Sequence, residues 1–202
     1  MKQFANVISI LFHPLLMTTY GMLLALNYTF LALHPVRLRL YELGGVILST
    51  AVIPGLLIML MVKSGAVTDL ELSNRRERAV PYLIVLTSNM ICLFYLFRLP
   101  LPAWLLMLFI GSCLAMFLAL CINFVWKISV HALGIGGLLG AIMIVARLLM
   151  SNPYQLIIIV FLFSGLVATS RIILKKHTPM QVYAGFLLGF ICTFGSSFYL
   201  FY

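Results

Sequence analysis

Three short polar stretches contain most of the residues in this sequence that could do chemistry. They run from Thr68 to Pro81, from Lys127 to His131 and from Ser170 to Gln181, with long apolar runs between them. Guanidinium groups that converge bind phosphate through paired hydrogen bonds. Phosphoryl transfer depends mainly on positioning and charge neutralisation, and cations around a histidine supply both. The residue types therefore favour phosphate chemistry.

The first stretch contains two arginines, Arg75 and Arg78, that are three residues apart. On a helical turn their side chains would share a face, where they could hold the oxygens of a phosphate. The alternative is a positive loop that sets the membrane topology or touches anionic headgroups. The stretch taken alone leaves both interpretations open.

The second stretch alternates Lys127, Ser129 and His131 just before an apolar, glycine-rich run. These residues could offer a cation, a hydroxyl or capping group, and a proton donor at one helix N-terminus, where anions are favoured. The alternative is that Ser129 only caps the helix and that His131 is an interfacial side chain.

The third stretch is the most informative. It begins with Ser170 and Arg171, has a gap of five residues before His177, and places Gln181 four residues further on. The segment from Thr178 to Gln181 also has the form of a capping box with proline at the first helical position. Gln181 is therefore expected either to cap the helix or to act at His177.

This third stretch resembles a signature of the type 2 phosphatidic acid phosphatase family, S-R-x5-H-x3-D followed by small residues. The second stretch resembles the family's P-S-G-H signature through Ser129 and His131. The first resembles its K-x6-R-P signature only loosely. The three occur in the family's order across residues 68–185.

The resemblance implies a metal-independent phosphatase, without a cofactor, that works through a covalent phosphohistidine. By position, His177 would attack phosphorus and His131 would protonate the departing oxygen, while Gln181 would stand at the position of the assisting aspartate. The expected phosphate-binding residues are Arg75, Arg78, Lys127, Ser129, Ser170 and Arg171.

Two departures from the family pattern bear on this expectation. No lysine stands seven residues before any arginine of the first stretch, and Pro81 does not directly follow Arg78. Lys127 could replace the missing cation. In place of the aspartate expected four residues after the nucleophile, the chain has Gln181, whose amide can accept a hydrogen bond from Nδ1 of His177 but has no charge.

The elements that position these stretches are membrane-spanning helices. Hydrophobic residues make up 64% of the 202 positions, charged residues make up 8%, and the mean hydropathy is +1.17. A soluble domain typically has about a quarter of its residues charged. The apolar runs are hydrophobic on every face rather than alternating, which indicates helices and not barrel strands. Runs near the length of about 20 residues that a span requires fall at 5–33, 43–62, 80–97, 102–126, 132–149, 155–174 and 180–201.

These runs predict one all-α integral membrane domain over residues 1–202, a six- or seven-span helical bundle. Two spans separate each polar stretch from the next, so all three stretches should reach the same membrane face. The first run holds His13-Pro14, where a bend is expected, and His13 should lie on or near the same side. His34 should be a loop residue on the opposite face.

We expect a hydrolase whose substrate is a membrane lipid phosphate, such as an isoprenyl diphosphate or phosphatidate. The expected location is a bacterial cell membrane. A net charge of +9 suggests contact with anionic lipids, and nucleic acid is not expected as a partner. The oligomeric state stays open. The alternative function is a non-catalytic family member that binds or moves an anionic lipid, with Gln181 marking lost chemistry.

Overall fold

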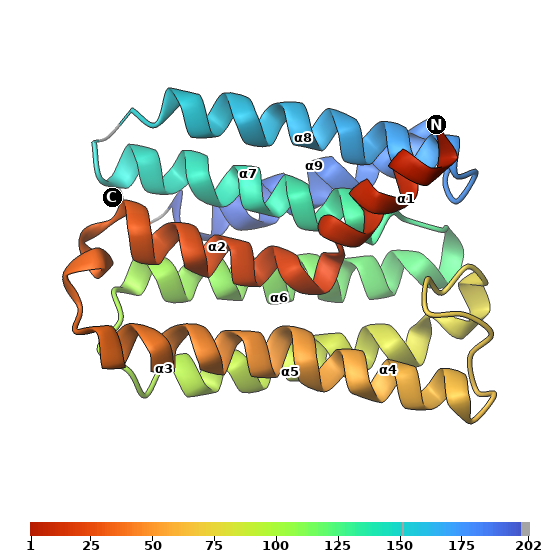
Figure 1. The fold of residues 1–202 in the computed structure, drawn as a ribbon, viewed down its shortest axis with the longest axis horizontal. Coiled ribbons are helices and arrows are strands. Elements are labelled where there is room, and N and C mark those ends of the chain that lie inside the picture. The colour runs from red at the N-terminus through yellow and green to blue at the C-terminus, as the bar shows by residue number, and fades with distance from the viewer. Residues whose placement is uncertain (151, 199–202) are drawn as a thin grey trace.

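The computed structural model describes residues 1–150 and 152–198, and within these ranges the chain is an all-helical bundle (Figure 1). Its helices are α1 (Lys2–Leu11), α2 (Pro14–Tyr28), α3 (Val36–Ile47), α4 (Ile53–Lys63), α5 (Ala79–Leu96), α6 (Ala103–Val125), α7 (Val130–Leu148), α8 (Tyr154–Ile173) and α9 (Pro179–Ser196). Short 3-10 turns at Phe30–Leu33 and Arg75–Glu77 and a π-helical turn at Leu48–Val52 connect some of them.

The chain is a multi-pass membrane protein. In the part of the chain that the structure describes, six helical stretches are long and apolar enough to cross a membrane, namely Val36–Lys63, Arg75–Leu96, Ala103–Val125, Val130–Leu148, Tyr154–Ile173 and Pro179–Ser196. The predicted six- or seven-span bundle is confirmed. The last predicted run, 180–201, extends beyond the described residues.

The seventh candidate span is broken where the sequence predicts a bend. Helices α1 and α2 meet at an angle of 55°. Pro14 occupies the first position of α2, where its missing N–H costs no hydrogen bond, and His13 Nδ1 accepts from the Leu15 N–H at 3.4 Å. The break leaves His13 at the junction of the two helices.

The second span begins earlier than the sequence predicts. The predicted run covers residues 43–62, whereas α3 begins at Val36, so residues 37–42 belong to its first turns. Their charges are accommodated by partners: Glu42 is fully buried with its Oε1 2.8 Å from His34 Nδ1, and Arg39 donates to Asn27 Oδ1 at 3.0 Å. His34 follows a 3-10 turn, and its ring contacts the buried carboxylate of Glu42 in α3.

Close packing of α7 against α9 depends on glycines. A Cβ added at Gly136 would collide with the carbonyl of Phe186, and one added at Gly189 would collide with the carbonyl of Leu133. Small residues let helix backbones approach closely in membranes. These glycines therefore serve helix packing within this chain.

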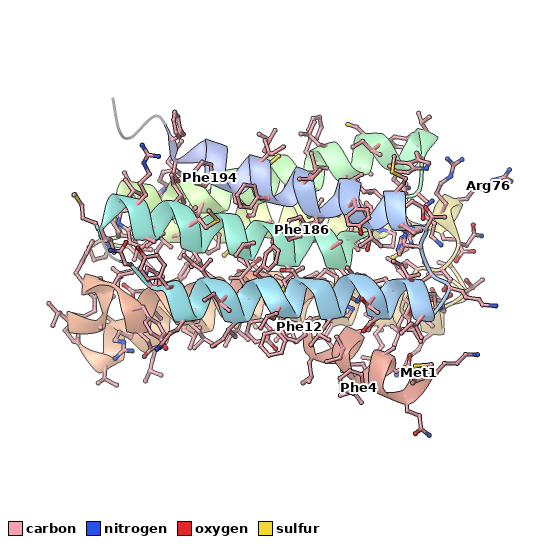
Figure 2. All side chains as sticks on the ribbon, turned by 90° about the horizontal axis from the view of Figure 1, so that it is seen from above. Met1, Phe4, Phe12, Arg76, Phe186 and Phe194 are labelled. Atoms are coloured by element: carbon pink, nitrogen blue, oxygen red, sulfur yellow. The ribbon has the colours of Figure 1, made fainter. Side chains whose placement is uncertain are left out.

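The three polar stretches meet at one end of the bundle, as predicted. The α4–α5, α6–α7 and α8–α9 connections and the junction of α1 with α2 lie toward the same end in Figure 1. We call this the polar end. Figure 2 shows Arg76 projecting beyond it and Phe4 on the outer side of α1. Exposed apolar side chains such as Phe4 and Phe161, each 61% exposed, are those that face lipid.

Candidate functional site

Hydrogen bonds join the three polar stretches to one another. The Ser129 N–H donates to the Gln181 carbonyl at 3.2 Å, which ties the second stretch to the third. Arg78 of the first stretch donates to the carbonyl of Ile128 at 3.1 Å, which ties the first stretch to the second. It also donates to the carbonyl of Leu72 at 2.6 Å within its own stretch. The polar end is therefore a connected structure and not a set of independent loops.

His177 lies in the short connection between α8 and α9 and is only 7% exposed. Lys175, with φ +54°, turns the chain out of α8, and Pro179 starts α9 at its first helical position. The break that Thr178 and Pro179 impose holds the imidazole at the membrane face.

Gln181 both caps α9 and contacts His177. Its amide Oε1 lies 3.2 Å from His177 Nδ1 and also accepts from the Thr178 N–H at 3.2 Å. Because an amide oxygen only accepts, Nδ1 of His177 carries the proton and Nε2 presents its lone pair. The capping box thus fixes the histidine tautomer that a nucleophile attacking through Nε2 requires.

The surroundings of His177 keep its ring neutral. Its pKa is lowered to about 3, chiefly by burial and then by the charges of Arg78, Arg171 and Lys127, while the bond to Gln181 opposes the shift. A neutral imidazole is the nucleophilic form. The pKa of Lys127 is also lowered, by burial and by Arg78, Lys176 and Arg171. Cations that repel one another in this way favour a bound anion.

Arg171 is the most buried cation of the site, at 1% exposure. It donates from Nη1 to Ser9 Oγ at 3.1 Å and from Nη2 to Glu71 Oε2 at 3.3 Å. Its Nε has no partner among the described residues. Ser9 comes from the buried face of α1, which packs on α8. Sequence reasoning missed Ser9, although the small pair Ala5 and Ser9, four residues apart, marks that face.

Glu71 supplies a carboxylate to two of the cations. Its Oε2 lies 3.3 Å from Arg171 Nη2 and 3.3 Å from Lys176 Nζ, and Lys176 also donates to Ser73 Oγ at 2.8 Å. Its side chain is 41% exposed. The Glu71 carboxylate of the first stretch therefore already occupies an anion position beside Arg171 and Lys176 of the third stretch. Lys176 is not among the site residues that the sequence predicts.

His131 and His13 form a second pair of imidazoles at the polar end. Their ring centroids are 5.5 Å apart and their planes are nearly perpendicular, at 78°. His131, in the first turn of α7, is 6% exposed and lies within electrostatic range of Arg171 and His177. His13 thus borders the site, beside the residue that the resemblance assigns to the leaving group.

The other expected site residues make hydrogen bonds to the backbone. Ser129 is fully buried and caps α7, accepting from the Ala132 N–H at 3.4 Å. The Ser170 hydroxyl donates to the Leu166 carbonyl at 2.7 Å within its own helix. Arg75 donates to the Val125 carbonyl at the end of α6. Of the expected phosphate-binding residues, the structure gathers Arg78, Lys127 and Arg171 around His177.

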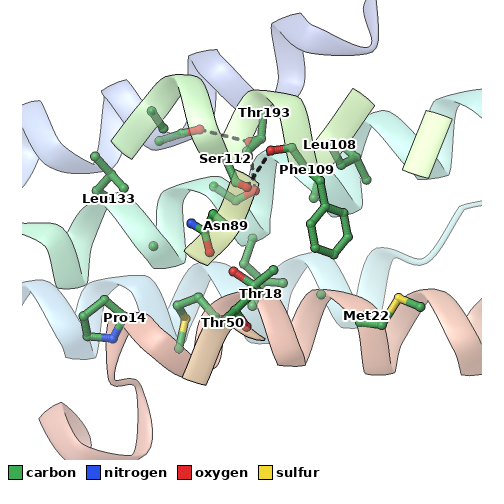
Figure 3. A pocket seen from close by; sticks show the side chains of 18 of the residues that line it. Pro14, Thr18, Met22, Thr50, Asn89, Leu108, Phe109, Ser112, Leu133 and Thr193 are labelled. Atoms are coloured by element: carbon green, nitrogen blue, oxygen red, sulfur yellow. Dashed lines mark hydrogen bonds between the residues drawn. The ribbon is translucent and has the colours of Figure 1, made fainter. Parts of the chain in front are cut away.

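An apolar chamber of about 480 Å³ opens from this site into the bundle (Figure 3). Its polar mouth includes His13, Glu71 and His131, and the rest of the lining comes mainly from α2, α5, α6 and α7. We call this cavity the chamber. A cluster of cations with an adjoining apolar space suits an amphiphilic anion better than a water-soluble one.

Comparisons of the chain with protein-family models, curated proteins and solved structures gave no match.

Proposed function

We propose that this chain is a metal-independent membrane phosphatase that hydrolyses a lipid phosphate or an isoprenyl diphosphate through a phosphohistidine. The observation that supports it best is the state of His177. The ring is buried, and its Nδ1 is held by the amide oxygen of Gln181. The positive charges of Arg78, Arg171 and Lys127 lower its pKa. Those are the features that a histidine nucleophile for phosphorus requires.

Substrate binding begins with an exchange of anions. The phosphate enters beside Arg171 and Lys176 and displaces the Glu71 carboxylate from them. Planar donors of Arg171 then hold two phosphate oxygens, while Lys127 adds a point charge. The negative charge of the phosphate offsets the repulsion among the cations.

The chemical steps follow from the two imidazoles. Nε2 of His177 attacks the terminal phosphorus, and the bond from that phosphorus to the leaving oxygen breaks with its electron pair staying on the oxygen. The leaving oxygen is the lipid's own oxygen in a monophosphate and the bridging oxygen in a diphosphate. His131, protonated in the phosphate complex, gives the oxygen its proton. Water, deprotonated by the now neutral His131, then attacks phosphorus and releases inorganic phosphate and free His177. We place the protein in a bacterial cell membrane, where anionic lipids would surround its positive polar end.

A panel of lipid phosphates in detergent micelles, assayed for phosphate release with and without EDTA, tests the proposal. We expect release from at least one lipid and the same rate in EDTA. Loss of activity in EDTA that returns with a divalent cation would refute metal independence.

The uncharged Gln181 favours a second candidate, a protein that binds or moves an anionic lipid without hydrolysing it. Its amide already serves as a helix cap, a role that needs no catalysis. Saturable binding of a lipid phosphate, with no phosphate release across the panel, would support this second function and exclude the first.

Replacing Gln181 by alanine should lower kcat by at least about tenfold, because His177 loses the acceptor that fixes its tautomer. Gln181→Glu should keep or raise kcat, since a carboxylate can accept the same two hydrogen bonds and stabilise the imidazolium. The matched control is Thr178→Ala, which weakens the helix cap but leaves the amide of Gln181 beside His177. An equal loss in Thr178→Ala and Gln181→Ala would reduce Gln181 to a capping residue.

The pH profile of Gln181→Glu should differ from that of the wild type in a defined direction. The wild-type pKa of His177 is about 3, so the nucleophile stays neutral well below the ordinary histidine value. A carboxylate at position 181 would raise that pKa. The ratio of kcat/KM for Gln181→Glu to that for wild type should therefore fall between pH 7 and pH 5 (about the range of an ordinary histidine). Substrate ionisation cancels in this ratio, and a flat ratio would contradict the assignment.

Replacing Glu71 by glutamine should strengthen substrate binding. The amide oxygen can still accept from Arg171 and Lys176, but it no longer competes with phosphate as an anion. We expect KM to fall by about three- to tenfold with kcat nearly unchanged. Glu77→Gln is the matched control, because Glu77 binds Thr68 and Asn74 instead. A higher KM in Glu71→Gln would show that Glu71 positions Arg171 and does not occupy the phosphate site.

A further inference from the structure

The chamber runs nearly the full depth of the membrane. Its lining follows α7 from His131 at the polar end to Leu149 just beyond the end of that helix. At 1.5 Å per residue these positions are separated by about 27 Å, close to the hydrocarbon thickness of about 30 Å. Tyr28 and Pro153 line its far end.

The chamber wall presents mostly apolar surface. Three of its hydroxyl groups donate to backbone carbonyls: Thr50 to Val46 at 2.8 Å, Ser112 to Phe109 at 2.8 Å, and Thr193 to Gly137 at 2.9 Å. Figure 3 places these side chains, with the Asn89 amide, among Met22, Leu108, Phe109 and Leu133. A hydroxyl that is already hydrogen-bonded to a carbonyl presents mainly its carbon atoms to the chamber. The wall therefore suits a hydrocarbon occupant.

The positions of His131 and His177 indicate which end of a bound lipid would enter the chamber. His131 lines the mouth of the chamber, whereas His177 and Arg171 are absent from its lining among the described residues. In the proposed reaction His177 binds phosphorus, and His131 protonates the oxygen that leaves with the lipid. The carbon attached to that oxygen therefore enters the chamber from the His131 side.

We infer that the chamber holds the single hydrocarbon chain of the leaving group, so the substrate is the phosphate or diphosphate of one long-chain alcohol. This inference rests on the proposed phosphatase function and narrows its substrate. A cavity of about 480 Å³ lies in the range of pockets that hold one drug-sized ligand. The two chains and glycerol of a diacyl lipid exceed that space. The phosphate of a single-chain lipid would lie just beyond the mouth, at Arg171 and Lys176, which contact Glu71.

Position 21 allows the chamber to be filled without disturbing the fold. Gly21 lines the chamber from α2, and a Cβ there meets nothing nearer than Leu138 Cδ1 at 3.7 Å. A leucine at this position would extend into the chamber. Gly165→Leu is the matched control, because Gly165 is exposed on α8, where an added Cβ meets nothing within 4 Å.

The assay compares farnesyl phosphate, dimethylallyl phosphate and dioleoyl phosphatidate as substrates. Wild type should prefer farnesyl phosphate over phosphatidate by at least about tenfold in kcat/KM. Gly21→Leu should lose at least about tenfold on farnesyl phosphate and stay within about twofold of wild type on dimethylallyl phosphate. Gly165→Leu should match wild type on both. Undiminished farnesyl phosphate hydrolysis by Gly21→Leu, or a preference for phosphatidate, would overturn the inference.

A readout that needs no turnover separates this inference from the proposed function. A farnesyl phosphonate with a diazirine at the end of its chain should label chamber peptides of α2 and α7 in wild type, and label them less in Gly21→Leu. Labelling confined to lipid-facing side chains of α8 would overturn the chamber assignment. Labelling in the chamber together with no phosphate release from any lipid would retain the occupant and refute the phosphatase.

Discussion

Replacing His177 by alanine is expected to abolish phosphate release, with a loss of at least about 10⁴-fold in kcat, because the covalent intermediate forms on its Nε2. The imidazole is 7% exposed, and the cations around it are held by bonds to the backbone and to Glu71. Removing the ring should therefore leave the anion-binding surroundings in place, and lipid phosphate should still bind.

Met180→Ala provides the control for this variant. Met180 lies three residues further along and is 70% exposed, so its truncation should leave both activity and thermal stability unchanged. Undiminished hydrolysis by a folded His177→Ala protein would refute the mechanism, whatever the outcome at other positions.

Replacing Arg171 by lysine should lower kcat/KM by at least about tenfold, or about 1.4 kcal/mol of transition-state stabilisation, although the charge is retained. Arg171 already reaches Ser9 with one terminal nitrogen and Glu71 with the other. A lysine ammonium is a point charge and cannot reproduce two parallel donors on phosphate while holding α1 in place.

Arg76→Lys is the matched control for Arg171→Lys. Arg76 belongs to the same polar end, but its side chain projects outward (Figure 2), so the same exchange there should leave kcat/KM unchanged. Activity of Arg171→Lys within about twofold of wild type would assign Arg171 a structural role.

The membrane spans and the convergence of the polar stretches could be predicted because both depend on local properties. Runs of apolar residues give the spans, and counting crossings places the stretches at one end. The break at His13-Pro14 follows from the restriction that proline puts on the preceding residue. The start of α3 could not be predicted in the same way, since charged residues at its first turns are stable only because His34 and Asn27 meet Glu42 and Arg39.

The sequence predicts which residues belong to the site, but it does not predict the hydrogen bonds and ion pairs among them. The interval between Arg171 and His177 is visible in the sequence, and so is the capping box that places Gln181. The bonds of Arg171 to Ser9 and Glu71 span 162 and 100 residues of chain. They depend on how α1 and the α4–α5 connection are rotated against α8, which no local pattern encodes. The chamber likewise exists only between packed helices.

The phosphohistidine is the central claim, and trapping it tests that claim most directly. Wild type mixed with a radiolabelled lipid phosphate and quenched rapidly in alkali should retain label that is stable to base and lost in acid. Peptide mapping should place that label on His177, and His177→Ala should retain none. Steady hydrolysis with no trapped label on wild type, or label mapped to another residue, would contradict the account.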